Sequence, residues 1–398
     1  MNNKNVQPSF GSWKIICFFY LALSFSVPVF SQYTIRLELI SLPATHETDS
    51  IFLAGNFNNW QPGKAGFSFF RNKNISFIEL TNITLGAYEF KFTRGSWQTV
   101  ECAADGKDLA NHSLQISSDT TIQYSIAAWN DDFAAVVKQH TASSRVHIID
   151  TAFKIPQLNR SGRIWLYLPP GYAKSKKKYP VMYMQDGQNI FDEYTSGFGE
   201  WGVDECLDSM IKKGKPACIV VGIDNGPRRL TEYNPYNSEQ FGKGEGDLYL
   251  EFIVKTLKPW IDKRYRTLRS KDNTIIAGSS MGGLISYYAL LKYPNIFGNA
   301  GVFSPAFWIA PEIKTLTDSL AGKMDGQIFF YMGGNEGEKY LADLEDITNS
   351  LGRSGASLIY SVIDPDGSHN EKAWRKWFVE FYSWIMNEGY NNVIKVDN

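Results

Sequence analysis

The chain has 398 residues, of which 43% are hydrophobic, 15% aromatic and 20% charged. This composition excludes a disordered chain, which would have few aromatic residues and a high net charge. The 40 basic and 41 acidic residues give a net charge of -1, so the chain as a whole has no positive field that would attract nucleic acid. The length exceeds that of one ordinary hydrophobic core and predicts two domains.

Residues 1–31 differ from the rest of the chain. They contain Lys4 and Lys14 but no acidic residue, and an apolar run over residues 15–23 is followed by a segment that ends at Ser31. A basic start, a short apolar run and such an end are typical of a secretory signal peptide. We therefore expect cleavage after Ser31, a secreted or periplasmic protein, and no stable membrane span, because the run is short for a bilayer. An uncleaved N-terminal anchor is the alternative.

Cysteine usage indicates neither a disulfide scaffold nor a zinc site. The expected mature chain keeps Cys102, Cys206 and Cys218, and this odd number leaves at least one thiol unpaired. Spacing alone does not decide whether Cys206 and Cys218 pair, and we expect buried, unpaired thiols. No pair of cysteines has zinc-ligand spacing, so we expect neither a metal nor a cofactor.

Short strands separated by turn residues fill the first part of the mature chain. Residues 35–39 and 87–92 alternate between apolar and polar side chains, and residues 50–54 are apolar. Glycine, asparagine and proline separate these runs, which is typical of a small β-sandwich. The pattern predicts an all-β domain over residues 32–128, followed by a linker over residues 129–145.

From residue 146 onward, apolar strands alternate with amphipathic helices. This alternation predicts an α/β fold over residues 146–398, with a mostly parallel sheet that carries helices on both faces. The expected strands are residues 164–168, 181–184, 218–221, 274–277 and 328–331, and the expected helices are residues 203–213, 248–261, 284–291 and 340–351.

One short motif in this second domain indicates a nucleophile. Residues 278–282 read Gly-Ser-Ser-Met-Gly and match G-x-S-x-G. The motif alone is weak, but here it follows an apolar strand and precedes a helix, which is the setting of a nucleophile elbow. We expect the turn to expose Ser280 and the N–H group of Met281 to face a developing oxyanion. An ordinary glycine-rich turn is the alternative.

A serine needs a base, and the order of residues along the chain selects one histidine. In the α/β-hydrolase order the base follows the serine. Of the five histidines, only His369 does so. It lies in a loop between the expected strand at residues 358–362 and the terminal helix, where such bases are found. The alternative is a surface-loop histidine without a catalytic role.

The third member of a triad is a carboxylate after a strand. Glu336 and Glu338 both follow the apolar run at residues 329–332. A carboxylate there can hold the imidazole and stabilise its protonated form. Spacing alone does not separate the two residues. Asp364 and Asp366 are less favoured because they are close to His369 in sequence, and a solvated acidic loop is the remaining alternative.

Several separated motifs resemble the putative-esterase family of α/β-hydrolases. These motifs lie at residues 179–188, 278–282, 304–308 and 367–371, and the resemblance covers residues 146 to the C-terminus. The family includes feruloyl and acetyl xylan esterases, S-formylglutathione hydrolase and siderophore esterases.

The resemblance implies a role for each matched residue. Ser280 falls on the family's nucleophile and His369 on its base. The family's G-x-x-[DE] strand end falls on residues 333–336 and favours Glu336 as the acid, although some siderophore esterases of the family lack this acid. The segment with Gly187 and Gln188 matches the one that supplies the second oxyanion N–H group.

The first domain resembles the starch- and glycogen-binding modules. Residues 54–60, 88–92 and 95–97 carry this resemblance. It implies that Trp60, Lys91 and Trp97 contact glucose rings, with Asn111 as a weaker candidate. Aromatic faces suit the apolar face of a sugar, and an ammonium group can donate to its hydroxyls. The alternative is a spacer domain whose tryptophans are packed.

Together these observations predict a serine esterase with an appended sugar-binding module. We expect a Ser-His-Glu triad, an acyl-enzyme intermediate and an acylated carbohydrate as substrate, with an α-glucan as a partner of the first domain. A siderophore or small-ester hydrolase is the second interpretation. A non-catalytic carbohydrate-binding protein is the third, but the complete set of Ser280, Glu336 and His369 favours an enzyme. No nucleic-acid partner is expected.

Overall fold

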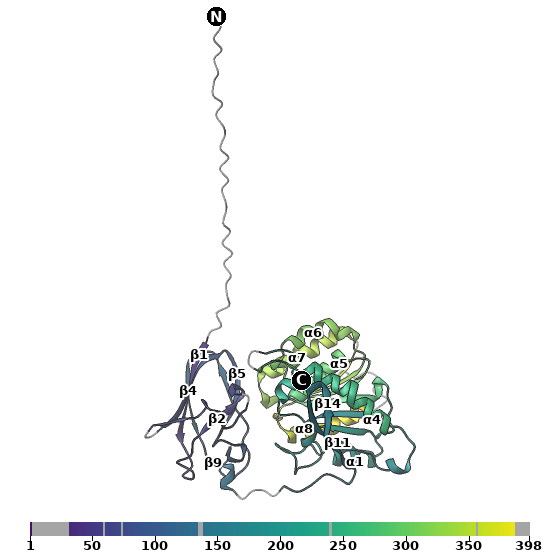
Figure 1. Ribbon diagram of the computed structural model, residues 1–398, viewed down its shortest axis with the longest axis horizontal. Coiled ribbons are helices and arrows are strands. Elements are labelled where there is room, and N and C mark those ends of the chain that lie inside the picture. Colours follow the sequence, from purple (N-terminus) through teal and green to yellow (C-terminus); the bar gives the residue numbers. More distant parts are fainter. Residues whose placement is uncertain are drawn as a thin grey trace. The chain divides into compact units, whose positions relative to one another are not determined.

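The computed structural model describes Met1 and residues 32–58, 60–72, 75–133, 138–238, 241–355 and 357–386. The signal peptide expected at residues 1–31 therefore lies, except for Met1, outside the described residues. Contacts divide the chain into two compact units, unit 1 (Met1–Ala135) and unit 2 (Val136–Asn398), and Figure 1 labels several of their elements.

Unit 1 consists of three antiparallel or mixed sheets that enclose one core. A four-stranded sheet has the order β3-β4-β1-β8, a three-stranded sheet the order β2-β5-β7, and β6 pairs with β9. The strands are β1 (Gln32–Ser41), β2 (Phe52–Gly55), β3 (Phe70–Asn72), β4 (Ile75–Thr84), β5 (Gly86–Thr93), β6 (Glu101–Cys102), β7 (His112–Ile116), β8 (Thr120–Ser125) and β9 (Ala128–Trp129).

The alternation expected for half-buried strands is visible in β5. Phe90 and Phe92 are fully buried, whereas Lys91 between them lies on the other face and is half-buried. Trp129 stands at the start of the expected linker, yet its side chain is only 2% exposed and packs into the same core. Its large apolar surface explains this placement, because burial of an aromatic ring is strongly favourable.

Unit 2 is built on one eight-stranded sheet with the order β10-β11-β13-β12-β14-β15-β16-β17. β10 and β11 are antiparallel to their neighbours, while β13, β12, β14, β15, β16 and β17 run parallel to one another. The strands are β10 (Val146–Ile155), β11 (Arg160–Tyr167), β12 (Val181–Gln185), β13 (Ile219–Ile223), β14 (Thr274–Ser279), β15 (Asn299–Phe303), β16 (Gln327–Gly333) and β17 (Leu358–Asp364).

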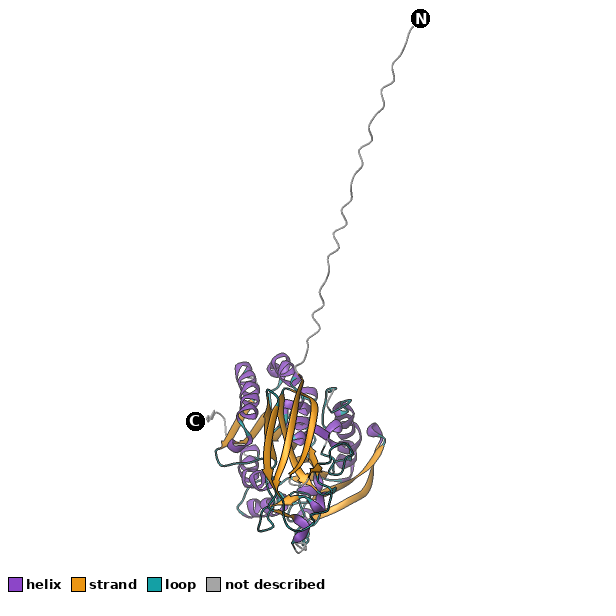
Figure 2. Ribbon diagram, turned by 90° about the vertical axis from the view of Figure 1, so that its left-hand side faces the viewer, coloured by secondary structure: helices purple, strands orange, loops and turns teal. Residues whose placement is uncertain are grey.

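Helices cover both faces of this sheet (Figure 2). Side chains of α1 and α8 share a buried cluster on one face, and those of α3 to α7 share a larger cluster on the other. The helices are α1 (Val203–Lys212), α2 (Arg229–Glu232), α3 (Gly246–Phe252), α4 (Lys258–Arg264), α5 (Met281–Lys292), α6 (Glu312–Leu320), α7 (Glu338–Ser354) and α8 (Glu371–Ile385). The expectation of an α/β-hydrolase sheet preceded by a β-rich domain is confirmed.

Two local features differ from the pattern expected from the sequence. The single helix expected at residues 248–261 is divided into α3, a π-helical turn (Ile253–Leu257) and α4. Pro259 stands in the first turn of α4, and because proline has no N–H group it interrupts regular helical hydrogen bonding there. The sequence pattern also did not reveal β10, β15, α2 and α6 of unit 2, or β3, β4 and β6 to β9 of unit 1.

The remaining sequence expectations concern cysteines and membrane spans. Cys102 and Cys218 are buried and Cys206 is half-buried, and all three are free, as expected. Within the described part of the chain, every helix is too short or too polar to span a bilayer.

Candidate active site

The G-x-S-x-G motif forms a tight turn between β14 and α5. β14 ends at Ser279, α5 begins at Met281, and Ser280 between them has φ 56° and ψ −121°. A residue with a side chain rarely adopts a positive φ, and such strain is concentrated at functional sites. The sequence therefore folds here into the strand–turn–helix geometry of a nucleophile elbow.

The glycines of the motif are required by close packing. A Cβ atom on Gly278 would lie 2.8 Å from the backbone of Gly282, and one on Gly282 would lie 3.0 Å from Cβ of Gln185. Gln185 is the last residue of β12, which pairs with β14. Larger side chains would push the elbow away from the neighbouring strand, so the two glycines fix the position of Ser280.

Backbone hydrogen bonds hold the strained turn in place. The N–H group of Ser280 donates to the carbonyl of Phe303 at 2.9 Å. The Ser280 carbonyl accepts from the N–H groups of Leu284 and Ala306, at 3.0 Å and 3.1 Å. The turn is therefore anchored both to its own helix and to the segment after β15.

The imidazole of His369 is bound to a buried carboxylate. His369 Nδ1 lies 2.7 Å from Oε2 of Glu336, whose side chain is 3% exposed. The Glu336 carboxylate also accepts hydrogen bonds at Oε1 from the N–H group of Gly333 at 2.8 Å and from the hydroxyl of Ser304 at 2.6 Å. A carboxylate held in this way fixes the imidazole orientation and leaves Nε2 for proton transfer.

A second layer of side chains positions this pair. The indole Nε1 of Trp374 donates to the hydroxyl of Ser304 at 2.9 Å. The Trp374 ring also meets the His369 ring edge to face, with centroids 5.1 Å apart. Trp374 therefore contacts the imidazole and supports, through Ser304, the carboxylate that binds it.

The sheet topology explains why these residues meet. Ser280 follows β14, Glu336 follows β16 and His369 follows β17, and β14 to β17 are consecutive parallel strands. The carboxyl ends of parallel strands lie along the same edge, which is where open α/β sheets bind their ligands. Residues separated by about ninety positions are thus gathered at one edge of the sheet.

The structure places Gly187 and Gln188 beside the elbow. They begin a short 3₁₀-helix (Gly187–Asn189) that follows β12, the neighbour of β14. N–H groups in the first turn of a helix have no intrahelical acceptor, and the same holds for Met281 at the start of α5. A Cβ atom on Gly187 would lie 2.8 Å from the backbone of Gly222, so only glycine fits there. These donors are suited to stabilise an oxyanion.

An ion pair that the sequence did not indicate anchors this segment. Asp186 has φ 55°, and its carboxylate accepts from Nε and Nη2 of Arg229 at 2.7 Å and 2.8 Å. Asn225 adds a hydrogen bond to the same carboxylate at 2.8 Å. Burial lowers the pKa of Arg229, but the interaction with Asp186 outweighs it and the net shift is upward. Arg229 therefore stays charged and clamps the turn.

The other candidate acids lie elsewhere. Glu338 is exposed in the first turn of α7, and Asp366 is exposed in the turn after β17. Asp364 is buried but accepts from Lys376 and Trp377, each at 2.7 Å. The structure brings Glu336, and none of these three, to His369.

Sequence reasoning did not single out Glu371, although it lies within one of the quoted motifs. The side chain is 6% exposed, and Nδ2 of Asn189 donates to its Oε1 at 3.4 Å. Burial raises the pKa of Glu371 to about 7, and a hydrogen bond from its own backbone N–H group and the positive charge of Arg229 oppose this shift. The site thus contains a buried carboxyl, that of Glu371, whose pKa is raised to about 7.

In unit 1 the structure brings the two expected sugar-binding tryptophans together. The rings of Trp60 and Trp97 lie 6.3 Å apart between centroids, inclined by 33°, and both side chains are half-buried. Lys91 donates to the carbonyl of Leu109, and burial lowers its pKa. Asn111 is exposed and donates to Glu89 at 3.1 Å.

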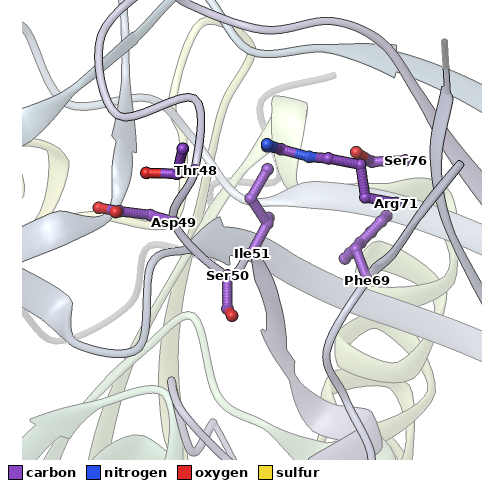
Figure 3. A pocket seen from close by; sticks show the side chains of 7 residues that line it. All are labelled: Thr48, Asp49, Ser50, Ile51, Phe69, Arg71 and Ser76. Atoms are coloured by element: carbon purple, nitrogen blue, oxygen red, sulfur yellow. The ribbon is translucent and has the colours of Figure 1, made fainter. Parts of the chain in front are cut away.

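Unit 1 also contains a separate pocket, shown in Figure 3. Its lining includes the apolar side chains of Ile51 and Phe69 and the charged side chains of Asp49 and Arg71. None of the expected sugar-binding residues lines this pocket, so it does not coincide with the tryptophan pair.

Comparison with known proteins gives a family match over most of unit 2. The sequence model described as putative esterase matches residues 155–382. The uncharacterized protein YbbA of Bacillus subtilis is 28% identical over 240 residues, which are 56% of this chain and 92% of YbbA. An endo-1,4-beta-xylanase/feruloyl esterase of Xylanibacter ruminicola is 31% identical over 153 residues, which are 37% of this chain but only 20% of that protein.

A solved structure shares the fold over a longer stretch. The enterobactin esterase FES from Shigella flexneri has a TM-score of 0.52 and 16% sequence identity, and the alignment covers 89% of this chain and 92% of FES. Unit 2 accounts for about two thirds of the chain, so the similarity in fold extends into unit 1.

The geometry separates the two candidate glutamates in a direct test. Glu336→Gln should lower kcat/KM for an activated ester by about 100-fold or more, because an amide stabilises the imidazolium poorly. Glu338→Gln should change it less than about twofold, because an exposed side chain away from His369 contributes little. The reverse ranking, or small equal effects, would contradict the assignment.

Glu371 should make stability depend on pH. Its ordinary pKa is 4.5 and burial raises it to about 7, so ionisation destabilises the native state increasingly as the pH rises from about 4.5 to about 7. We expect the free energy of unfolding of Glu371→Gln, minus that of the parent protein, to be about 1–3 kcal/mol larger at pH 8 than at pH 5. Urea denaturation at the two pH values measures it. Glu380→Gln, an exposed change on the same helix, is the control. An equal effect of Glu371→Gln at both pH values would refute the shift.

Proposed function

The chain belongs to the putative esterase family and is a carboxylic ester hydrolase. We propose that it cleaves acyl esters of a glycan or glycan-derived substrate, and that the reaction passes through an acyl-enzyme on Ser280. One observation carries the proposal. A strained serine at a β14–α5 elbow lies at the same sheet edge as a histidine whose Nδ1 is 2.7 Å from a buried glutamate. Serine, histidine and carboxylate at neighbouring strand ends are the parts of a serine esterase.

Each residue has a defined task in the proposed reaction. Ser280 Oγ attacks the ester carbonyl carbon while its proton passes to Nε2 of His369, and the imidazolium is stabilised by Glu336. The N–H groups of Met281 and of the Gly187–Gln188 turn stabilise the oxyanion. His369 then protonates the leaving alcohol, and the acyl group stays on Ser280. A water molecule, deprotonated by His369, releases the acid in the second half of the cycle.

Three separate features support a glycan substrate. The relative from Xylanibacter ruminicola is an endo-1,4-beta-xylanase/feruloyl esterase, although this chain spans only 20% of it. Unit 1 presents Trp60 and Trp97 as a pair of half-exposed rings, which suits weak stacking against sugars. The basic, then apolar N-terminal sequence supports export of the protein to the compartment where such polymers are found.

A siderophore ester is the second candidate substrate. The observation that favours it is the shared fold with the enterobactin esterase FES, which covers 89% of this chain and includes part of unit 1. Unit 1 would then act as a spacer instead of binding a polymer.

A substrate panel separates the two candidates. The full chain is incubated with acetylated xylan, feruloylated oligosaccharides and a catechol-serine lactone, and the released acid is measured. The proposal expects at least about tenfold higher kcat/KM on an acylated oligosaccharide than on the lactone. The opposite preference would make the siderophore assignment the better one.

Removal of the nucleophile tests the catalytic assignment. Ser280→Ala should lower turnover of an activated ester by about 10⁴-fold or more, because no hydroxyl remains to accept the acyl group. Circular dichroism and the midpoint of thermal unfolding should stay close to those of the parent protein. Undiminished hydrolysis by a purified Ser280→Ala protein would refute the proposed nucleophile.

Calorimetry on the full chain tests the role of unit 1. A soluble α-glucan should bind weakly, because a shallow face leaves many hydroxyls hydrated and each ring contributes about 1 kcal/mol. The double change Trp60→Ala and Trp97→Ala should abolish this heat and leave kcat/KM for a small soluble ester within about twofold. No heat from the folded parent protein with any α-glucan or xylan would indicate a spacer instead.

A further inference from the structure

Three acidic side chains that have no role in the proposed triad converge at the start of α1. Glu200, Asp204 and Glu205 each place a carboxylate oxygen within 4.8 Å of the others. Asp204 is fully buried, Glu200 is 7% exposed, and Glu205 is half-buried. Carboxylates are almost never buried without a partner, so such a group needs a compensating positive charge or a proton.

The partners seen in the structure do not compensate this charge. One oxygen of Asp204 accepts from the N–H group of Ser143 at 2.7 Å, and Nη1 of Arg375 lies 3.6 Å from Oε2 of Glu200. Yet Oε1 of Glu200, Oδ1 of Asp204 and Oε2 of Glu205 are buried and accept no hydrogen bond from any described residue. Thr141 and the Ser143 hydroxyl also contact Glu200 and Asp204, and Asp204 and Glu205 contact each other, but none of these contacts brings a positive charge. Three carboxylates thus face one guanidinium, and one oxygen of each accepts no hydrogen bond from a described residue.

We propose that Glu200, Asp204 and Glu205 bind one divalent metal ion, and that this ion is Ca²⁺. Two oxygens bound to the same Ca²⁺ at about 2.4 Å cannot lie more than about 4.8 Å apart, and the cluster meets this limit. The donors are all carboxylate oxygens, which select hard cations over zinc or copper. Ca²⁺ tolerates irregular oxygen geometry, whereas Mg²⁺ requires a near-ideal octahedron.

This site was not expected from the sequence, which has no histidine or cysteine pattern of a metal centre. The three residues occur as Glu-Trp-Gly-Val-Asp-Glu over residues 200–205, and such a short acidic segment ordinarily lies on the surface. Here Trp201, which packs against Phe303 and Trp374, draws the segment into the core. The fold thereby buries the charges.

The position of the cluster gives the ion a structural role. The N–H group of Trp201 donates to the carbonyl of Asn189 at 2.9 Å, and that of Val203 donates to Ile190 at 3.0 Å. Asn189 ends the 3₁₀-helix that carries Gly187 and Gln188. A bound ion would therefore stabilise the start of α1, which these backbone hydrogen bonds connect to the segment with the proposed oxyanion donors.

The competing explanation is a shared proton. Burial raises the pKa of Glu205 to about 7, with repulsion from Asp204 as the second cause. A proton between Asp204 and Glu205 would also remove one negative charge. A metal site predicts that added Ca²⁺ binds and stabilises the protein, whereas a shared proton predicts no effect of Ca²⁺. Binding measurements therefore distinguish the two explanations.

Terbium luminescence and thermal unfolding test the site in the full chain. After treatment with EDTA and buffer exchange at pH 7.5, Tb³⁺ should give emission sensitised by Trp201, which lies next to Glu200, and Ca²⁺ should displace it. Addition of 1 mM CaCl₂ should raise Tm by at least about 3 °C, because a ligand that binds only the native state stabilises it.

Two matched variants locate the effect. Glu205→Gln should weaken Tb³⁺ and Ca²⁺ binding at least about tenfold and should raise the Tm of the metal-free protein, because it removes one uncompensated buried charge. Glu345→Gln makes the same chemical change on an exposed position of α7 and should leave binding unchanged. A substitution that raises the Tm of the metal-free protein and at the same time weakens its stabilisation by Ca²⁺ is specific to a cation site.

Two results would overturn the proposal. One is a folded parent protein that shows neither sensitised Tb³⁺ emission nor a Tm shift with Ca²⁺, which would leave proton sharing as the explanation. The other is equal Ca²⁺ binding by the parent protein and by Glu205→Gln, which would place the ion elsewhere. If Glu205→Gln fails to fold, direct titration of the parent protein with Ca²⁺ by calorimetry still decides the question.

Discussion

The buried carboxylate of Glu336 is the interaction on which the active-site edge of unit 2 depends. It accepts from Gly333 at the end of β16, from Ser304 after β15, and it binds His369 after β17. One side chain thereby joins three neighbouring strand ends. Its negative charge is desolvated but fully hydrogen-bonded, which is the condition under which a buried carboxylate orients an imidazole.

The elbow supplies the second constraint, which is steric and not electrostatic. Ser280 keeps a strained backbone because Gly278 and Gly282 allow β14 to approach Gln185 closely. This close packing of β14 against β12 also places the 3₁₀-helix after β12 beside Ser280. The Asp186–Arg229 ion pair holds that helix in position. Nucleophile, base and oxyanion donors thus follow neighbouring strands of the sheet, and hydrogen bonds and an ion pair hold the turns that carry them.

The sequence predicted those features that depend on local pattern or on chain order. The elbow at residues 278–282 and the choice of His369 required only a motif and the order of residues. Spacing did not separate Glu336 from Glu338, because the 3₁₀ turn (Gly334–Glu336) that directs one side chain inward has no sequence signature. The partners Arg229 and Trp374, and the buried cluster around Asp204, depend on long-range packing. The hydrophobic periodicity of a sequence does not predict such contacts.

Covalent labelling of Ser280 tests the central claim most directly. A fluorophosphonate reacts with an activated serine and leaves a stable adduct. The account predicts one adduct per chain by intact-mass spectrometry, located by peptide analysis on Ser280, and much slower labelling of the His369→Ala variant. Absence of an adduct on a folded protein, or an adduct on another residue, would contradict the assignment of the nucleophile.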